Sequence, residues 1–329
     1  MRRHLTVQGE TFPLSTPFRI SRGTKTAAEV VTVHLAQDGA TGRGECVPYP
    51  RYGETVESTI AAIEKVRDAL RDGAGRHDLL QLMPAGAARN AVDCALWDLE
   101  AKLSGTPVAT ALGLAEPLPP IATAMTVGLD APERMGIAAS ALATVPLIKV
   151  KVDRSDPAAQ LRAVRAAAPL PRMIVDPNES WTIDEVRSLQ DLLVALKVDL
   201  LEQPLPAGDD GALAGFVSAI PIAADESVHE AANLDALPDG YGVVNIKLDK
   251  AGGLTAALDL AAAARARGLG VMTGCMVCSS LSIAPAMMIA ADSVFADLDG
   301  PIWLAQDRDG GVACVDGMLS PPQPGFWGS

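Results

Sequence analysis

Three acidic residues follow consecutive apolar segments in the middle of the sequence. Asp176, Glu202 and Asp225 each come directly after a short run of apolar residues. Three carboxylates that converge on one point disfavour each other's ionised form unless a cation lies between them. Ligands that are all oxygen, with no His or Cys beside them, favour Mg²⁺. The alternative is that each carboxylate caps the helix after its segment.

Three lysines end or occupy two further apolar segments. Lys149 and Lys151 alternate with apolar residues, so both belong to one face of a strand, and Lys247 follows a second strand-like segment. An exposed strand face is the alternative for the first two. Neighbouring ammonium groups, burial and a nearby cation would together bring a lysine pKa into the range of a general base.

Two further aspartates, Asp297 and Asp299, follow Phe295 and Ala296 and again share one face. If the apolar segments are strands of a barrel, this pair ends the eighth strand, opposite the strands of the acidic trio, and is unsuited to the same metal. A pair of carboxylates there suits the ammonium group of a substrate. The alternative is a polar loop after the last strand.

The cysteines do not indicate a disulfide framework. There are five of them, an odd number, and no signal peptide precedes them, so we expect reduced thiols. Cys275 and Cys278 form a CxxC pair, which supplies only half of a tetrahedral zinc site.

The segments that carry these residues recur along the chain. From about residue 120, short β-branched runs alternate with Ala-rich and Leu-rich helical stretches, and successive runs end about 22 to 27 residues apart. Eight such units close a barrel, whereas the LxxLxL repeat of a leucine-rich solenoid is absent. A doubly wound sheet would carry a phosphate-binding loop after its first strand. The eight runs end near Val127, Lys151, Asp176, Glu202, Asp225, Lys247, Gly274 and Asp297.

We therefore expect an α/β protein built on a TIM-type (β/α) barrel over residues 116–300. Residues 1–115 are predicted to form an α+β capping domain, with a hairpin around Asp38 and Gly39 and helices over residues 56–70 and 92–103. Residues 301–329 are rich in Pro and Gly, contain a strand near 310–315, and are predicted to return to the capping domain.

A barrel would set Lys151 and Lys247 on opposite walls, because strands two and six lie four places apart. Active sites of such barrels lie at the carboxyl ends of the strands. A substrate carbon between the two amines could lose a proton to one and regain a proton from the other, which inverts a stereocentre. A metal-bound carboxylate would make the carbon more acidic by several kcal/mol.

Composition excludes several other classes of protein. The 329 residues carry 27 Lys and Arg against 40 Asp and Glu, a formal charge of −13, which argues against nucleic-acid binding. No segment approaches the roughly 18 consecutive apolar residues of a membrane span. We expect a cytoplasmic protein with a small-molecule substrate, and the sequence leaves open whether it forms a homo-oligomer.

These residues together resemble the enolase superfamily, in particular its muconate-lactonizing branch. The KxK motif at Lys149 to Lys151, the acidic trio and Lys247 carry the resemblance, and residues 89–99 look like the capping-domain helix of that branch. Residues 295–301 are similar to the DxD motif of dipeptide epimerases. Residues 274–276 and 49–54 look like the L-Ala-D/L-Glu epimerases of murein peptide recycling.

The resemblance implies a role for each part of the site. The dipeptide carboxylate would bind Mg²⁺, its α-carbon would lie between Lys151 and Lys247 with Lys149 assisting by charge, and its ammonium group would meet the aspartate pair. Residues 20–26 would form a lid over the substrate. The residues available for the substrate side chain and its surroundings are Arg22, Lys25, Arg51, Cys275 and Met276.

Two rival functions remain at this point. A muconate cycloisomerase or an o-succinylbenzoate synthase would use the same scaffold, but its substrate has no ammonium group to explain Asp297 and Asp299. A non-catalytic barrel that binds a ligand would not need a full set of metal ligands and two bases.

Overall fold

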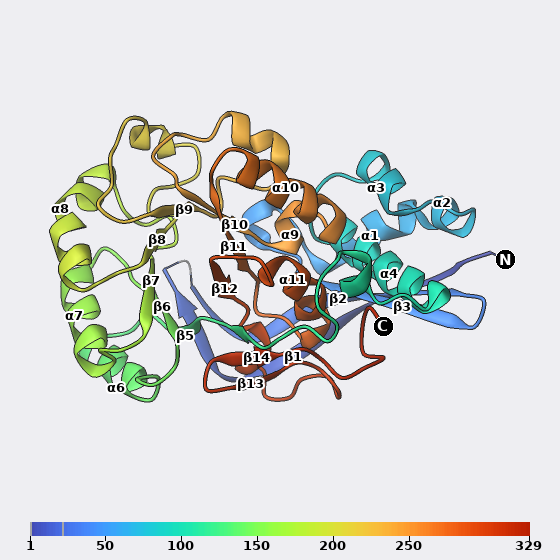
Figure 1. The fold of residues 1–329 in the computed structure, drawn as a ribbon, viewed down its shortest axis with the longest axis horizontal. Coiled ribbons are helices and arrows are strands. Elements are labelled where there is room, and N and C mark those ends of the chain that lie inside the picture. The colour runs from blue at the N-terminus through green and yellow to red at the C-terminus, as the bar shows by residue number, and fades with distance from the viewer. Residues whose placement is uncertain (1, 22) are drawn as a thin grey trace.

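An eight-stranded parallel sheet forms the centre of the molecule (Figure 1). The computed structural model describes residues 2–21 and 23–329, and the strands of this sheet pair in chain order. Ala124 N donates a 2.8 Å hydrogen bond to Ala296 O, which brings the two edges together, so the sheet is a nearly closed barrel. The predicted TIM-type barrel is confirmed. Its strands are β5 (Met125–Val127), β6 (Leu147–Lys151), β7 (Arg172–Asp176), β8 (Leu200–Glu202), β9 (Ile222–Ala224), β10 (Val243–Ile246), β11 (Gly270–Gly274) and β12 (Phe295–Asp297).

A ring of apolar side chains fills the part of the barrel nearer the amino ends of its strands. Each strand, or the residue just before it, supplies one member of this buried cluster. Because side chains of a strand alternate between its two faces, the residue two positions later points inward again, nearer the carboxyl end. The ring consists of Ala124, Leu147, Ile174, Leu200, Ala223, Val243, Met272 and Phe295. Lys149, the acidic trio and Asp297 therefore form the next inward layer, and Lys151, Lys247 and Asp299 follow two positions further towards the carboxyl ends.

Helices cover the outside of the barrel. The α-helices are α6 (Pro132–Ser140), α7 (Pro157–Ala167), α8 (Ile183–Ala195), α9 (Leu248–Ala251), α10 (Leu254–Ala266) and α11 (Ser280–Ala290). Short 3₁₀ helices follow β8, β9 and β12, namely η2 (Asp210–Leu213), η3 (Ala231–Asp235) and η4 (Gly300–Trp303). Among the described helices, none is long and apolar enough to span a bilayer.

The helices after the three acidic strand ends begin several residues further on. The cap of α8 is Thr182, η2 begins after Asp209, and η3 begins after Glu230. The interpretation of the acidic trio as helix caps is therefore wrong. These carboxylates lie instead at the carboxyl ends of their strands, at the mouth of the barrel.

The N-terminal part is an antiparallel sheet with helices packed on one face. Its strands are β1 (His4–Ile20), β2 (Gly23–Gln37) and β3 (Ala40–Cys46). The predicted hairpin turn is present, with Asp38 and Gly39 both at positive φ. The helices are η1 (Pro50–Tyr52), α1 (Val56–Lys65), α2 (Arg67–Arg71), α3 (Arg76–Leu82), α4 (Ala87–Ser104) and α5 (Val108–Ala111).

Close packing of α4 on β3 depends on a glycine. A β-carbon on Gly44 would lie 2.0 Å from Ala91 O, a distance at which the helix could not stay in place. This close approach buries the shared apolar core of the N-terminal domain.

The long β1–β2 hairpin reaches from the N-terminal domain to the mouth of the barrel (Figure 1). Phe18 packs edge-on against Trp303 with ring centroids 4.7 Å apart, and Leu14 pairs with Leu304. Ser21 Oγ donates a 3.3 Å hydrogen bond to Asn178 O. The end of the predicted lid thus contacts residues at the barrel mouth.

Helix α4 fixes the N-terminal domain to two consecutive barrel helices. Arg89 donates to the carbonyls of Ala251 and Gly252 at the end of α9, at 2.7 and 3.0 Å. One turn later, Asp93 accepts hydrogen bonds from the backbone and the hydroxyl of Thr255 in the first turn of α10. A cation at a helix C-terminus and an anion at a helix N-terminus are both favourable.

The C-terminal segment contacts both parts of the molecule. Its strands β13 (Ala313–Val315) and β14 (Met318–Ser320) pair with each other, and β14 pairs with β4 (Ile121–Ala122) at the entry to the barrel. Trp327 Nε1 donates to Arg43 O and Cys94 O in the N-terminal domain, at 3.1 Å each.

Candidate active site

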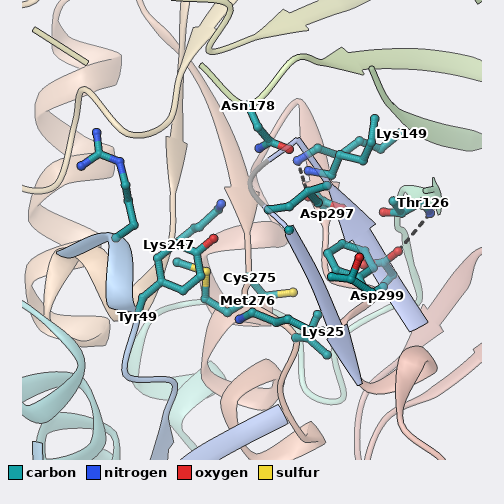
Figure 2. A pocket seen from close by; sticks show the side chains of 18 of the residues that line it. Lys25, Tyr49, Thr126, Lys149, Asn178, Lys247, Cys275, Met276, Asp297 and Asp299 are labelled. Carbon is teal, nitrogen blue, oxygen red and sulfur yellow. Dashed lines mark hydrogen bonds and ion pairs between the residues drawn. The ribbon is translucent and has the colours of Figure 1, made fainter. Parts of the chain in front are cut away.

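A cavity of about 470 Å³ lies between the hairpin tip, η1 and the carboxyl ends of the barrel strands. Figure 2 shows the side chains around it, with Lys149 and Lys247 entering from different sides of the view. Most of the residues predicted from the sequence line this one cavity: Lys25, Arg51, Lys149, Lys151, Lys247, Cys275, Met276, Asp297 and Asp299. Arg22 lies outside the described residues.

The KxK lysines are buried and contact the acidic trio. Lys151 Nζ lies 2.5 Å from Asp176 Oδ2, and Lys149 Nζ lies 3.2 Å from the same oxygen. Lys149 Nζ is also 2.7 Å from Glu202 Oε2. The interpretation of these lysines as an exposed strand face is therefore wrong, because both amines point into the barrel.

Asp225, the third member of the trio, contacts two further lysines. Its Oδ2 accepts a 2.7 Å hydrogen bond from Lys247, and its Oδ1 lies 2.7 Å from Lys250 Nζ. Lys250 is fully buried and also donates to the carbonyls of Asp225, Val228 and Asn245. Lys250 could not be predicted from the sequence, because no strand pattern or motif marks its position in α9.

The lysine pKa values differ from the expectation. Burial alone would lower the pKa of Lys149, but the carboxylates of Asp297, Glu202 and Asp176 outweigh burial and hold that pKa well above its usual value. Asp225 likewise raises the pKa of Lys247 above its usual value, against the opposing effect of burial. The expected lowering did not allow for carboxylates whose charge is directed at the amines.

The acidic trio has the composition of a site for a hard divalent cation. The described residues contain no group of three or more His, Cys, Asp or Glu side chains already arranged around a metal position. Glu202 Oε2 and Asp225 Oδ1 are buried, and each lies 2.7 Å from a lysine amine without a hydrogen bond of normal geometry. Burial, followed by the charge of Asp176, raises the pKa of Glu202 to about 7. Three buried carboxylates that converge at one place are the type of oxygen ligand that Mg²⁺ prefers.

Asp297 ends β12 and Asp299 follows it, two strands along the barrel from β10, which precedes Lys247. Asp299 Oδ2 accepts a 3.0 Å hydrogen bond from Thr126 N (Figure 2). It also accepts a 3.2 Å hydrogen bond from Trp303 Nε1. Asp297 Oδ2 accepts a 2.7 Å hydrogen bond from Lys149. Burial, and then the charge of Asp297, raises the pKa of Asp299 to about 6. The pair therefore favours a cation beside it.

The cations on the capping side differ in their surroundings. Arg51 makes two 3.0 Å hydrogen bonds with the carboxylate of Glu179, which neutralises much of its charge. Lys25 Nζ lies over the ring of Tyr49, 4.8 Å from its centroid, and faces the cavity.

Two amide side chains that were not predicted from the sequence form hydrogen bonds with the acidic trio. Asn245 Nδ2 donates a 2.8 Å hydrogen bond to Glu202 Oε1. Gln203, at a positive φ of 33°, accepts from the backbone N–H of Asp225 at 2.8 Å. The two-residue spacing of Asn245 and Lys247 on one strand was a signal that could have revealed the first of them.

Comparison with protein families decides the family of this chain. Residues 2–113 match the N-terminal domain of mandelate racemase and muconate lactonizing enzyme, and residues 136–326 match the enolase C-terminal domain-like family. The chain belongs to the enolase superfamily. The resemblance read from the sequence is thus confirmed.

Known enolase-superfamily relatives align over nearly the whole chain. An L-Ala-D/L-Glu epimerase of Escherichia coli is 47% identical over 96% of this chain and 99% of its own length. An N-acetyl-D-glutamate racemase of a Pseudoalteromonas species is 43% identical over 91% of this chain and 95% of its own length. With such relatives, the chain is an isomerase of the racemase and epimerase type.

Solved structures show the same fold. An enolase family member from Agrobacterium tumefaciens, described as having homology to dipeptide epimerases and crystallised with sodium and L-Ala-L-Glu, superposes with a TM-score of 0.96. It is 48% identical, over 99% of this chain and all of its own. A dipeptide epimerase from Methylococcus capsulatus, complexed with Mg and L-Arg-D-Lys, superposes with a TM-score of 0.90 at 33% identity, over 99% of each chain.

Proposed function

We propose that this enzyme epimerises a dipeptide at the α-carbon of its C-terminal residue, with L-Ala-D/L-Glu as its substrate. The observation that carries the proposal is the placement of Lys151 and Lys247. Their strands lie four places apart in the barrel, and both amines line the same cavity. One amine removes the α-proton from one face of the carbon, and the other amine returns a proton to the opposite face.

The acidic trio supports the choice of a carbon next to a carboxylate as the reacting centre. Asp176, Glu202 and Asp225 would hold Mg²⁺, whose positive charge makes the adjacent α-proton more acidic when a substrate carboxylate is bound. The charge of Lys149 would add to this effect. A structural relative that binds Mg together with a dipeptide supports the same choice.

The aspartate pair supports a substrate with a free amino group. Asp297 Oδ1 is buried and forms no hydrogen bond with described residues. Burial and the charge of Asp297 disfavour the ionised form of Asp299 and raise its pKa, and a neighbouring cation would stabilise that form. Both aspartates would bind the ammonium group of the dipeptide. Lys25 would bind the acidic side chain, because Arg51 is already paired with Glu179. A role in recycling peptidoglycan peptides in the cytoplasm is part of this proposal.

A second candidate is racemisation of N-acetylglutamate, which has no ammonium group. Lys149 neutralises part of the charge of Asp297, so this end of the cavity need not hold a cation. The relative at 43% identity is named for that activity.

Deuterium exchange separates the two candidates. The protein is incubated with Mg²⁺ in D₂O with L-Ala-L-Glu, a small dipeptide panel, or N-acetyl-D-glutamate, and the α-proton signals are followed by NMR. We expect exchange with inversion at the Glu residue of L-Ala-L-Glu, abolished in Lys151→Ala and in Lys247→Ala. Exchange of N-acetylglutamate alone would establish the second candidate, and exchange at the Ala residue would show that the substrate lies reversed.

A further inference from the structure

The CxxC pair lies at the edge of the cavity without a part in the proposed epimerisation. Cys275 directly follows β11, is partly exposed and lines the cavity (Figure 2). Cys278 is fully buried, one residue before Ser279, which caps α11. Both are free thiols.

The two sulfurs lie close together beside Gly300. A β-carbon on Gly300 would lie 3.0 Å from Cys278 Sγ and 3.2 Å from Cys275 Sγ. The sum of these distances, about 6.2 Å, is the largest separation that the two sulfurs can have. After burial, a hydrogen bond with the Cys275 side chain is the next cause that raises the pKa of the Cys278 thiol. Since Gly300 has no side chain, it leaves the space between the sulfurs open.

The two thiols differ in access. A small solute that enters the cavity can reach Cys275, whereas Cys278 has no exposed surface. The sulfur of Cys278 is instead within reach of Cys275. This is the arrangement of an exposed thiol that is oxidised first and a neighbouring thiol that resolves the product.

We propose that Cys275 and Cys278 form a site of reversible oxidation, in which hydrogen peroxide converts the two thiols into an intramolecular disulfide in the wall of the cavity. The Cys275 thiolate attacks one peroxide oxygen, the O–O bond breaks, and the hydroxide that leaves takes up a proton to become water. Cys275 is now a sulfenic acid. Cys278 loses its proton and attacks the Cys275 sulfur, the S–O bond breaks, and the second hydroxide leaves as water.

The disulfide changes the cavity wall. An S–S bond is about 2.05 Å long, so the Cys275 sulfur must move towards the buried Cys278 and away from the cavity. The backbone of Met276 and Gly300 lies at the same place, next to Asp299. If the cavity binds the substrate as proposed above, oxidation lowers the epimerase activity and reduction restores it.

Mass spectrometry of the full-length protein tests the proposal without an activity assay. Trypsin releases residues 268–308 as one peptide, which contains Cys275 and Cys278 and none of the other three cysteines. After treatment with hydrogen peroxide, we expect this peptide to lose the mass of two hydrogens and to regain it with dithiothreitol. Methionine sulfoxides in the same peptide add oxygen and are not reduced by dithiothreitol, so they do not imitate this result.

Variants test the order of the two steps. In Cys278→Ala, the reaction should stop at a sulfenic acid on Cys275 that dimedone traps. In Cys275→Ser, peroxide should leave the buried Cys278 unmodified. Cys314→Ser is the matched control, since Cys314 is a partly exposed thiol away from the pair, and it should oxidise at residues 268–308 as the wild type does.

Two outcomes would overturn the proposal. One is a wild-type peptide that keeps both thiols or gains oxygen on sulfur without losing two hydrogens. The other is oxidation of Cys278 in Cys275→Ser at the wild-type rate. Because the mass readout does not depend on the substrate, a disulfide that forms in a protein without epimerase activity would contradict only the proposed function.

Discussion

Lys149 donates a 2.7 Å hydrogen bond to Asp297 while its amine also contacts Glu202 at 2.7 Å. One buried cation therefore connects the carboxylates proposed for the metal with a carboxylate proposed for the substrate ammonium group. Any change in the charge of Asp297 acts on both ends of the cavity.

This connection predicts that Asp297→Asn lowers kcat/KM through Lys149 as well as through the substrate. A hydrogen bond to a charged group contributes about 1.5 to 3 kcal/mol, so we expect a loss of about 10- to 100-fold in kcat/KM. In a double-mutant cycle with Lys149→Met, the two losses should not add. Fully additive losses would contradict the connection. Asp130→Asn, which breaks the exposed pair with Arg134, is the control and should change little.

Lys250 is predicted to stabilise the fold and to hold Asp225. Lys250→Met leaves Asp225 without one of its two cationic partners and removes one donor from each of three backbone carbonyls. Removal of one partner of a buried ion pair costs about 3 to 5 kcal/mol, which urea unfolding measures. Arg187→Met, at an exposed ion pair, should cost less than about 1 kcal/mol. Equal losses in the two variants would contradict the role of Lys250.

Much of the site could be predicted from the sequence because strand alternation is a local rule. Lys149 and Lys151 follow Leu147 at steps of two, and Asp176 follows Ile174 in the same way, so all of them point into the barrel. The spacing of the strands then placed their carboxyl ends at one mouth.

The partners of these side chains could not be predicted, because they come from distant parts of the chain. Arg51 was a candidate for the substrate side chain, yet its guanidinium pairs with Glu179, 128 residues away. Lys149 was expected to have a lowered pKa, yet three carboxylates from three other strands raise it. Pairwise distances of this kind depend on the folded barrel rather than on any local pattern.

Gly274 is predicted to leave space for Lys247. A β-carbon at this position would lie 2.7 Å from Asn245 Oδ1 and 3.1 Å from Lys247 Cε. Gly274→Ala should therefore displace the amine and lower kcat more than it raises KM, by about 10-fold or more. Gly242→Ala is the matched control, since a β-carbon there meets nothing within 4 Å. An unchanged kcat in Gly274→Ala would show that the lysine does not need this space.

Removal of divalent cations should abolish exchange of the α-proton without unfolding the protein. The buried acidic trio is the proposed metal site, and a bound ion stabilises the folded state in proportion to the logarithm of its concentration. We expect EDTA to stop the exchange, and Mg²⁺ to restore it and to raise the melting temperature. Glu202→Gln should weaken Mg²⁺ binding measured by calorimetry. A rate unaffected by EDTA would remove the metal from the proposal.

Asp249 is predicted to make the stability of the fold depend on pH. This buried carboxyl joins the two domains, because its Oδ1 accepts hydrogen bonds from Val47 N and Asn90 Nδ2. Burial raises its pKa from 3.8 to about 7, the two hydrogen bonds oppose the shift, and the charges of Glu54 and Glu45 add to it. A carboxyl with a raised pKa in the folded state favours folding at low pH and loses this contribution as pH rises.

Asp249→Asn isolates this contribution, because an amide oxygen can still accept both hydrogen bonds but does not ionise. The contribution of Asp249 is complete below pH 4 and is lost between about pH 4 and pH 7, a change of the order of 4 kcal/mol. Urea unfolding across this range should therefore show the wild type losing stability relative to the variant as pH rises. Parallel stability curves for the two proteins would contradict the raised pKa, since a carboxyl that stays ionised throughout adds no slope between them.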